Sequence, residues 1–185
     1  MSTVNASDAR GTKDIVEPLE RAFETIFREH YRMAYRTAYG VLGTAEDAED
    51  VAQTIFARLL HRDLPAALVK NPKAYLYRAA VNESLNLIRR RKRTVLTGDD
   101  ERFEALQPSP DDSAEEIHRM LYEAVAKLHP RSAEILVLRY VHKYSLAEVA
   151  KLLGTSRSTV AVSLYRSRSR LRKWMRASSL SGGQS

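Results

Sequence analysis

The segment over residues 145–176 most constrains the fold, because it carries the sequence marks of two short helices joined by a tight turn. Ser145 and Glu148 have the spacing of a capping box, which predicts the start of a helix. Gly154 provides the left-handed backbone conformation at which a helix ends sharply, and Ser156 is suited to cap the helix that follows. The segment therefore predicts a helix-turn-helix, whose second helix is free to enter the major groove of DNA.

An ordinary helical hairpin with a basic surface is the alternative interpretation of this segment. Small Ala150 lies four residues before the turn glycine and apolar Val160 lies six residues after it, a spacing that lets the two helices pack closely. A run of arginines follows in the second helix. Since the caps, the glycine, the packing residues and the basic run agree within one window, DNA binding is the favoured interpretation.

The charge of the whole chain favours a polyanionic partner. The 185 residues carry a formal net charge of +7 and a pI of about 9.7, which suits nucleic acid or an anionic membrane surface. Residues 99–116 hold eight acids and one base, so the rest of the chain carries +14. The chain has no cysteine, which excludes disulfides and thiolate zinc sites. It has neither a membrane-spanning apolar stretch nor the pattern of a signal peptide, so we expect a soluble, cytoplasmic protein.

Apolar residues recur every three or four positions through most of the chain, which predicts helices, and no segment has a convincing strand pattern. The first helix is expected over 19–43. Thr44 with Asp47 resembles a capping box for the second helix. A loop over 61–70 precedes a third helix over about 71–93, which an Asn-Pro pair opens.

The second half of the chain begins with a different composition. Residues 94–112 contain three consecutive acids and two prolines without a sustained period, which predicts a linker. Ser113 and Glu116 form a further capping-box pattern that starts a fourth helix, and a fifth helix precedes the helix-turn-helix. We therefore predict an all-α fold of two small helical domains, over 19–93 and 113–176, joined by a flexible acidic linker over 94–112. Residues 1–18 and 177–185 are expected to be disordered.

The third predicted helix has two faces of different chemistry. At 100° per residue its apolar residues fall within one arc of roughly 140°, which is predicted to face the core. An opposite arc of roughly 80° is predicted to be exposed and collects Tyr75, Arg78, Asn82, Asn86, Arg89 and Arg93. Glu83 is the only acid near this face and lies toward its edge.

The side chains of that exposed face suit unpaired nucleic acid. An aromatic ring stacks on a base, a carboxamide recognises the edge of a base, and arginines bind phosphates. The residues alone leave an equal alternative, in which a basic helix contacts only the DNA backbone or a solvated face has Tyr75 partly buried.

The start of the second predicted helix is strongly acidic, with four acids within five residues: Glu46, Asp47, Glu49 and Asp50. Carboxylates near a helix N-terminus complement the helix dipole, which accounts for one or two of them. In a basic protein such a cluster also has the chemistry of a docking patch for a basic partner surface.

Specific segments in both halves resemble one protein family. The string DAEDVAQTIF in the second predicted helix, NPKAYLYRAAVN at the start of the third, and SLAEVAKLLGTSRSTV in the helix-turn-helix are similar to bacterial sigma factors of the extracytoplasmic-function group. The resemblance to this group of the sigma-70 family covers residues 23–176. It implies a sigma region 2 helical bundle and a sigma region 4 helix-turn-helix bundle. The implied function is to direct RNA polymerase core to promoters and to aid promoter melting, without enzymatic activity or a cofactor.

The resemblance also implies roles for individual residues. Docking on the clamp helices of the largest polymerase subunit is assigned to Asp47, Glu49, Asp50, Val51, Gln53 and Phe56. Minus-10 binding is assigned to Tyr75, Arg78, Asn82, Asn86, Arg89 and Arg93, and minus-35 binding to Ser156, Arg157, Ser158, Thr159, Tyr165 and Arg166. The loop over 61–70 would hold a flipped base of the non-template strand, and the linker would pass near the RNA exit path. The flap of the second-largest subunit is a further expected partner, and regulation by an anti-sigma factor is common in the family.

The chain departs from the family pattern at two places. Many members have Asp where this chain has Asn86, so a carboxylate is absent from that position. Basic residues are usual where this chain has Ala161, Val162 and Ser163. The commonest specific base contact joins an arginine to guanine, and it cannot come from these three positions. We expect a minus-35 sequence that differs from that of typical relatives, recognised through Arg157, Ser158, Tyr165 and Arg166.

Two other classes of protein fit the sequence less well. A stand-alone helix-turn-helix repressor or activator would have a ligand-binding or dimerisation domain in its N-terminal half, where this chain has the acidic cluster and the Tyr/Asn/Arg face. An enzyme is disfavoured because the five histidines have no metal-ligand spacing, and no glycine-rich phosphate loop or nucleophile motif occurs.

Overall fold

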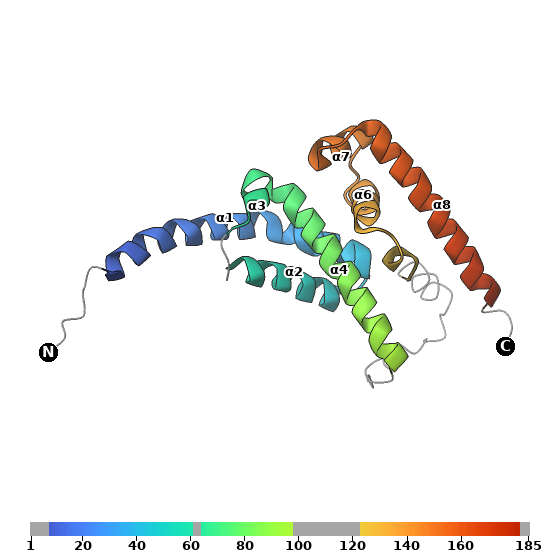
Figure 1. Ribbon diagram of the computed structural model, residues 1–185, viewed down its shortest axis with the longest axis horizontal. Coiled ribbons are helices and arrows are strands. Elements are labelled where there is room, and N and C mark those ends of the chain that lie inside the picture. Colours follow the sequence, from blue (N-terminus) through green and yellow to red (C-terminus); the bar gives the residue numbers. More distant parts are fainter. Residues whose placement is uncertain (1–7, 61–63, 98–122, 182–185) are drawn as a thin grey trace.

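The computed structural model describes residues 8–60, 64–97 and 123–181, and every regular element in them is a helix (Figure 1). The elements are α1 (Asp8–Leu42), α2 (Ala45–Leu60), α3 (Ala66–Lys70), α4 (Pro72–Thr97), α6 (Pro130–Tyr140), α7 (Leu146–Leu153) and α8 (Arg157–Ser181). The predicted all-α class is therefore confirmed, while the predicted acidic linker lies mostly outside the described residues. Among the described residues no helix is long and apolar enough to cross a bilayer.

The three long helices extend beyond their predicted bounds. Helix α1 begins at Asp8 instead of residue 19, α4 continues past Arg93 to Thr97, and α8 continues into the predicted C-terminal tail as far as Ser181. In the sequence, each of these helices ends at the residue before a glycine. Once a helix has formed, each added residue gains a backbone hydrogen bond, so it continues until a residue that disfavours it. The loss of apolar periodicity, which set the predicted bounds, does not by itself end a helix.

The predicted loop over 61–70 contains the short helix α3. Pro65 precedes it, and the N–H groups of Leu68 and Val69 donate to the Pro65 carbonyl at 2.8 and 3.1 Å. Leu68 is fully buried, which anchors this turn on the bundle. Residues 61–63 lie outside the described residues.

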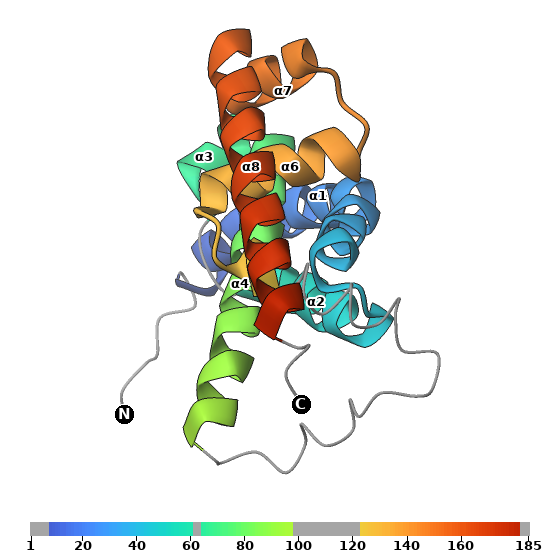
Figure 2. The ribbon, with the colours of Figure 1, turned by 90° about the vertical axis from the view of Figure 1, so that its right-hand side faces the viewer.

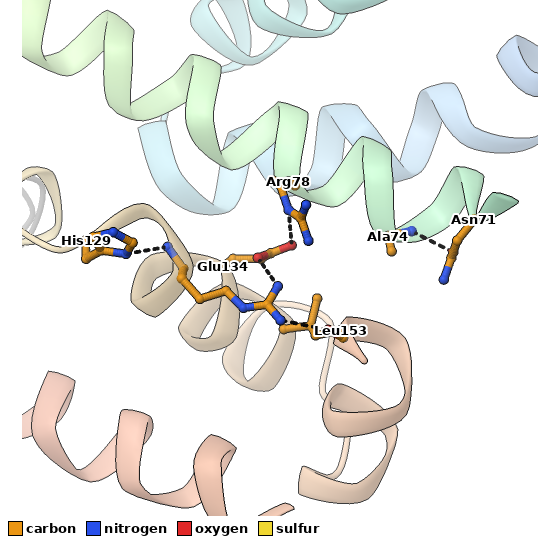
Figure 3. Close-up of polar contacts among 7 residues, drawn as sticks. Asn71, Ala74, Arg78, His129, Glu134 and Leu153 are labelled. Carbon is orange, nitrogen blue, oxygen red and sulfur yellow. Dashed lines mark hydrogen bonds and ion pairs between the residues drawn. The ribbon is translucent and has the colours of Figure 1, made fainter. Parts of the chain in front are cut away.

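Helices α1, α2 and α4 form the N-terminal group, and α1 packs against both others. Their shared core is apolar, with Val51, Ile55, Leu76, Ala80 and Leu85 at most 5% exposed. The predicted start of α4 is confirmed, because the Asn71 side chain accepts a hydrogen bond from the Ala74 N–H at 3.0 Å (Figure 3).

The C-terminal group consists of α6, α7 and α8, and it contains the predicted helix-turn-helix. Ser145 and Glu148 exchange both hydrogen bonds of the capping box at the start of α7. Gly154 ends that helix with a φ of 61°, in the left-handed region. The Ser156 hydroxyl then accepts a hydrogen bond from the Thr159 N–H at 3.0 Å, as predicted for the start of α8. The predicted fourth helix starts outside the described residues, and residues 123–126 of it are helical.

The two groups pack against each other and share one continuous apolar core. Figures 1 and 2 show α6 beside α4, with α8 on the outer side of α6. The turn between α6 and α7 also reaches the N-terminal group. In this turn, His142 contacts Thr37 of α1 at 2.9 Å, and the Tyr144 hydroxyl contacts the Tyr77 hydroxyl of α4 at 3.1 Å. We call the whole surface over which the two groups pack, including these contacts, the inter-group interface.

Gly40 of α1 lies directly against Val141 at the inter-group interface. A Cβ atom at position 40 would lie 2.5 Å from Cγ2, 2.8 Å from Cγ1 and 3.2 Å from Cβ of Val141. These separations leave no room for a methyl group, so the glycine is required by the contact.

Candidate polymerase and nucleic-acid interfaces

The acidic cluster of α2 divides into an exposed part and a buried part. Glu49, Asp50 and Gln53 are exposed, and Glu49 accepts hydrogen bonds from the Tyr31 hydroxyl at 2.6 Å and from Gln53 at 3.2 Å. Burial and the hydrogen bond to Glu49 raise the pKa of Tyr31 to about 12, so its hydroxyl stays a donor. These side chains form a polar surface that a basic partner could contact.

Asp47 belongs to the buried part. Its carboxylate receives two hydrogen bonds from Arg91 of α4, at 2.5 and 2.6 Å, and one from the Thr44 hydroxyl at 2.7 Å. Burial alone would raise the pKa of Asp47, but the bonds from Arg91 and Thr44 outweigh it and hold the pKa below its usual value. Asp47 thus joins α2 to α4. Its place four residues before buried Val51, on the apolar stripe of α2, was the sequence signal for this role.

Four aromatic rings lie beside the acidic surface, and the family resemblance assigned only one of them, Phe56, to polymerase docking. Phe27 of α1 has its ring centroid 5.1 Å from that of Phe56 in α2 and 4.8 Å from that of Tyr31, and Phe23 adjoins them. Phe56 is buried, whereas Phe27 is 40% exposed. The surface next to Glu49 is therefore partly apolar, as protein-docking surfaces commonly are at their centre.

The predicted minus-10 face of α4 is only partly exposed. Arg78, Asn86 and Arg93 are exposed, while Tyr75, Asn82 and Arg89 are half-buried. The covering residues come from the C-terminal group. Arg89 donates to the backbone carbonyls of Ala126 and Leu128, each at 3.3 Å.

Arg78 reaches a carboxylate that is buried in α6 (Figure 3). Its Nε lies 3.8 Å from Oε1 of Glu134, whose side chain is only 2% exposed. The other carboxylate oxygen accepts a hydrogen bond from Arg131 at 2.9 Å, and Arg131 also donates to the Leu153 carbonyl at 2.7 Å. Burial raises the pKa of Glu134, although the charges of Arg131 and Arg78 oppose the shift. Glu134 thereby links α4, α6 and the end of α7.

Asn82 presents a further sign of coverage, because its side-chain oxygen is buried and has no hydrogen-bond partner among the described residues. A buried polar atom without a partner is costly. The prediction that this whole face is exposed was wrong, since periodicity within α4 carries no information about residues 37 to 56 positions further along the chain.

Glu83 also differs from its predicted place at the edge of the exposed face. It is buried, and it accepts hydrogen bonds from Arg58 of α2 at 2.7 and 3.2 Å and from Arg90 at 3.4 Å. The pair with Arg58 ties α2 to α4 and leaves the Tyr/Asn/Arg face without an exposed acid.

Helix α8 presents the predicted minus-35 residues on its outer side. Arg157, Ser158, Thr159, Tyr165 and Arg166 are exposed, whereas Val160, Leu164 and Ser167 face the core. The helix contains seven basic residues and no acid. A helix with this charge suits the phosphates that flank a DNA groove.

No group of histidine and acidic side chains that could hold a metal ion occurs among residues 8–60, 64–97 and 123–181.

Comparisons with known proteins account for both groups of helices. The model of sigma-70 region 2 matches residues 26–94, and the model of sigma-70 region 4 matches residues 118–171. The RNA polymerase sigma-E factor of Streptomyces coelicolor is 31% identical over 82% of this chain and 84% of its own length. The RNA polymerase sigma factor SigV of Bacillus subtilis is 28% identical over 77% of this chain and 84% of its own length. The solved structure of CnrH in complex with the cytosolic domain of CnrY is 24% identical, with a TM-score of 0.46, over 85% of this chain and 90% of CnrH.

The helix-turn-helix of α7 and α8, the acidic and aromatic surface of α1 and α2, and the region 2 and region 4 matches agree with one another. The chain belongs to the extracytoplasmic-function group of the sigma-70 family, whose members direct RNA polymerase to promoters.

Proposed function

We propose that this sigma factor docks on core polymerase through α1 and α2, binds the minus-10 element through α4 and binds the minus-35 element through α8. The proposal rests on the placement of acidic and basic side chains on different helices of region 2. The exposed acids Glu49 and Asp50 lie on α2, while the arginines of the Tyr/Asn/Arg face lie on α4. Region 2 can therefore hold a basic protein surface and DNA at the same time.

The polymerase partners follow from the family. The clamp helices of the largest subunit contact Glu49, Asp50 and Gln53, with the exposed ring of Phe27 as the apolar centre of the surface. Asp47, Val51 and Phe56 support this surface from beneath, because all three are buried. Region 4 contacts the flap of the second-largest subunit.

The minus-10 proposal requires region 4 to leave region 2. Arg78 and Arg89 are held by α6 and by the turn before it, so these side chains contact DNA only after the inter-group interface opens. The described structure is then the form of the free protein, and promoter binding is coupled to the separation of the two regions.

Transcription in vitro with reconstituted core polymerase tests the proposal. Promoters selected from a random library should share two elements, and initiation should depend on both. Tight binding of the isolated protein to duplex DNA, without affinity for core polymerase, would show that the proposal is wrong. Such behaviour belongs to a stand-alone repressor or activator, a class that the region 2 match over residues 26–94 does not support.

Asp50→Lys is expected to weaken core-polymerase binding by about tenfold, because it places a cation against a basic partner surface. Asp50 is exposed on α2, so the folded state is expected to be retained. The affinity is measured by fluorescence anisotropy with labelled protein. Glu29→Lys, at an exposed position on the opposite side of α1 from Phe27, makes a comparable change of charge and serves as the matched control. An equal loss in both variants would indicate a general charge effect instead of a docking site.

Asn82→Ala is expected to reduce open-complex formation by about tenfold, the value of one good contact to a base edge, and to leave polymerase binding unchanged. The side-chain oxygen of Asn82 has no partner within the described part of the chain, so alanine removes no internal hydrogen bond there. Permanganate reactivity of promoter thymines measures the opening. A parallel fall in polymerase affinity or in thermal stability would assign Asn82 a structural role.

A further inference from the structure

Val162 lies at the centre of the exposed side of α8. The core-facing residues of the first turns are Val160, Leu164 and Ser167, all at most 7% exposed. At 100° per residue, Val162 points away from the middle of that group, and its side chain is 47% exposed. Ser158 and Arg166 lie one turn before and after it, and the three residues line the edge of a shallow groove that α8 shares with Ser132 of α6.

An isolated exposed valine is ordinary on a protein surface. The position of Val162 is different, because the N-terminal turns of the second helix of a helix-turn-helix are the part that meets base edges. Among its exposed neighbours, Arg157 and Arg166 suit phosphates and base acceptors, and Tyr165 adds an exposed ring with a hydroxyl group. Among the groups that base pairs present in the major groove, the C5-methyl of thymine is the apolar one.

We propose that Val162 contacts the C5-methyl group of a thymine in the minus-35 element and is a specificity-determining residue of this protein. The inference rests on the proposed function of α8. Ser158 and Arg166 each lie about 6 Å from Val162 along the helix axis. This distance corresponds to one or two base-pair steps of about 3.4 Å, so these polar residues reach base pairs on either side of the thymine.

Replacing thymine by uracil tests the contact to this one group, because uracil differs from thymine only by the missing C5-methyl group. The reconstituted holoenzyme first selects its promoter, and each thymine of the minus-35 element is then replaced singly by deoxyuridine. At one position the wild-type holoenzyme should bind about fourfold more weakly, the factor expected for one methyl group taken out of water. The Val162→Ala holoenzyme should bind the thymine and uracil promoters equally at that position.

Two controls separate this contact from other effects. Tyr140→Ala, which removes an exposed ring from α6 outside the helix-turn-helix, should keep the preference for thymine. Uracil in the minus-10 element should affect wild type and Val162→Ala alike. Because alanine has a higher helix propensity than valine and Val162 is exposed, the thermal midpoint of Val162→Ala should not fall.

The inference is overturned if no minus-35 thymine can be distinguished from uracil by the wild-type holoenzyme, or if Val162→Ala keeps the discrimination. In either case, promoter-dependent initiation would leave the proposed function intact. A holoenzyme that initiates at no promoter would instead remove the proposed function, and the inference with it.

Discussion

Gly40→Leu is expected to separate region 4 from region 2. A Cβ at position 40 would lie 2.5 Å from Cγ2 and 2.8 Å from Cγ1 of Val141, and leucine adds three further side-chain carbons at this contact. In α1 itself, leucine is favoured over glycine by about 0.8 kcal/mol, so the helix is retained. The substitution therefore opens the interface without changing a residue assigned to DNA.

Two measurements report this opening. Since the chain has no cysteine, cysteines introduced at exposed Arg28 and Arg168 accept a pair of fluorophores, and energy transfer between them should fall in Gly40→Leu. Release of Arg78 and Arg89 should also strengthen binding of a single-stranded minus-10 oligonucleotide. An increase of about tenfold corresponds to a free protein that is open roughly one tenth of the time.

A paired substitution provides the control for Gly40→Leu. Gly40→Ala alone should open the interface, and Val141→Ala in the same chain should close it again, because alanine at position 141 lacks the two methyl groups at 2.5 and 2.8 Å. Unchanged energy transfer and unchanged oligonucleotide binding in Gly40→Leu would contradict the packed arrangement as the form of the free protein.

Features that depend on a few neighbouring residues could be predicted from the sequence. The capping box of α7, the left-handed Gly154 and the caps at Asn71 and Ser156 are all present as expected. Each of them is set by side chains within three or four residues of the backbone group that they satisfy.

Features that depend on distant parts of the chain could not be predicted in the same way. The contact between Thr37 and His142 spans 105 positions, and no local pattern marks it. Asp47 and Glu83 appeared to be surface acids because their partners, Arg91 and Arg58, lie on other helices. The candidate minus-10 site was consequently identified by its residue types, while its partial coverage by region 4 required the structure.

Acidification from pH 7.5 to pH 5 is expected to open the same interface. Burial, together with the positive charges of Arg36 and Lys73, lowers the pKa of His142 from 6.5 to about 4. The Thr37 hydroxyl donates to the Met33 carbonyl at 2.7 Å, so its oxygen accepts a hydrogen bond from Nε2–H of neutral His142. A second proton would create a cation that the positive charges of Arg36 and Lys73 oppose.

The sign of the pH effect follows from the two pKa values. The packed state holds His142 neutral down to about pH 4, whereas the released histidine takes up a proton below its ordinary pKa of 6.5. Packing is therefore favoured above pH 6.5, and its stability is lost as the pH falls from 6.5 toward 4. Between pH 7.5 and pH 5 this linkage shifts the equilibrium toward the open form by roughly twentyfold to thirtyfold.

His142→Gln isolates this contribution, because its neutral amide can still donate to Thr37 and does not titrate. Glu134, whose pKa is raised by burial, acts in the opposite direction, since its packed form gains a proton more readily as the pH falls. Because Glu134 is present in both proteins, its contribution cancels when the pH profile of His142→Gln is subtracted from that of wild type. Energy transfer in the doubly labelled protein should fall between pH 7.5 and pH 5 in wild type and much less in His142→Gln. Equal pH profiles for the two proteins would exclude His142 as the group that weakens the interface in acid.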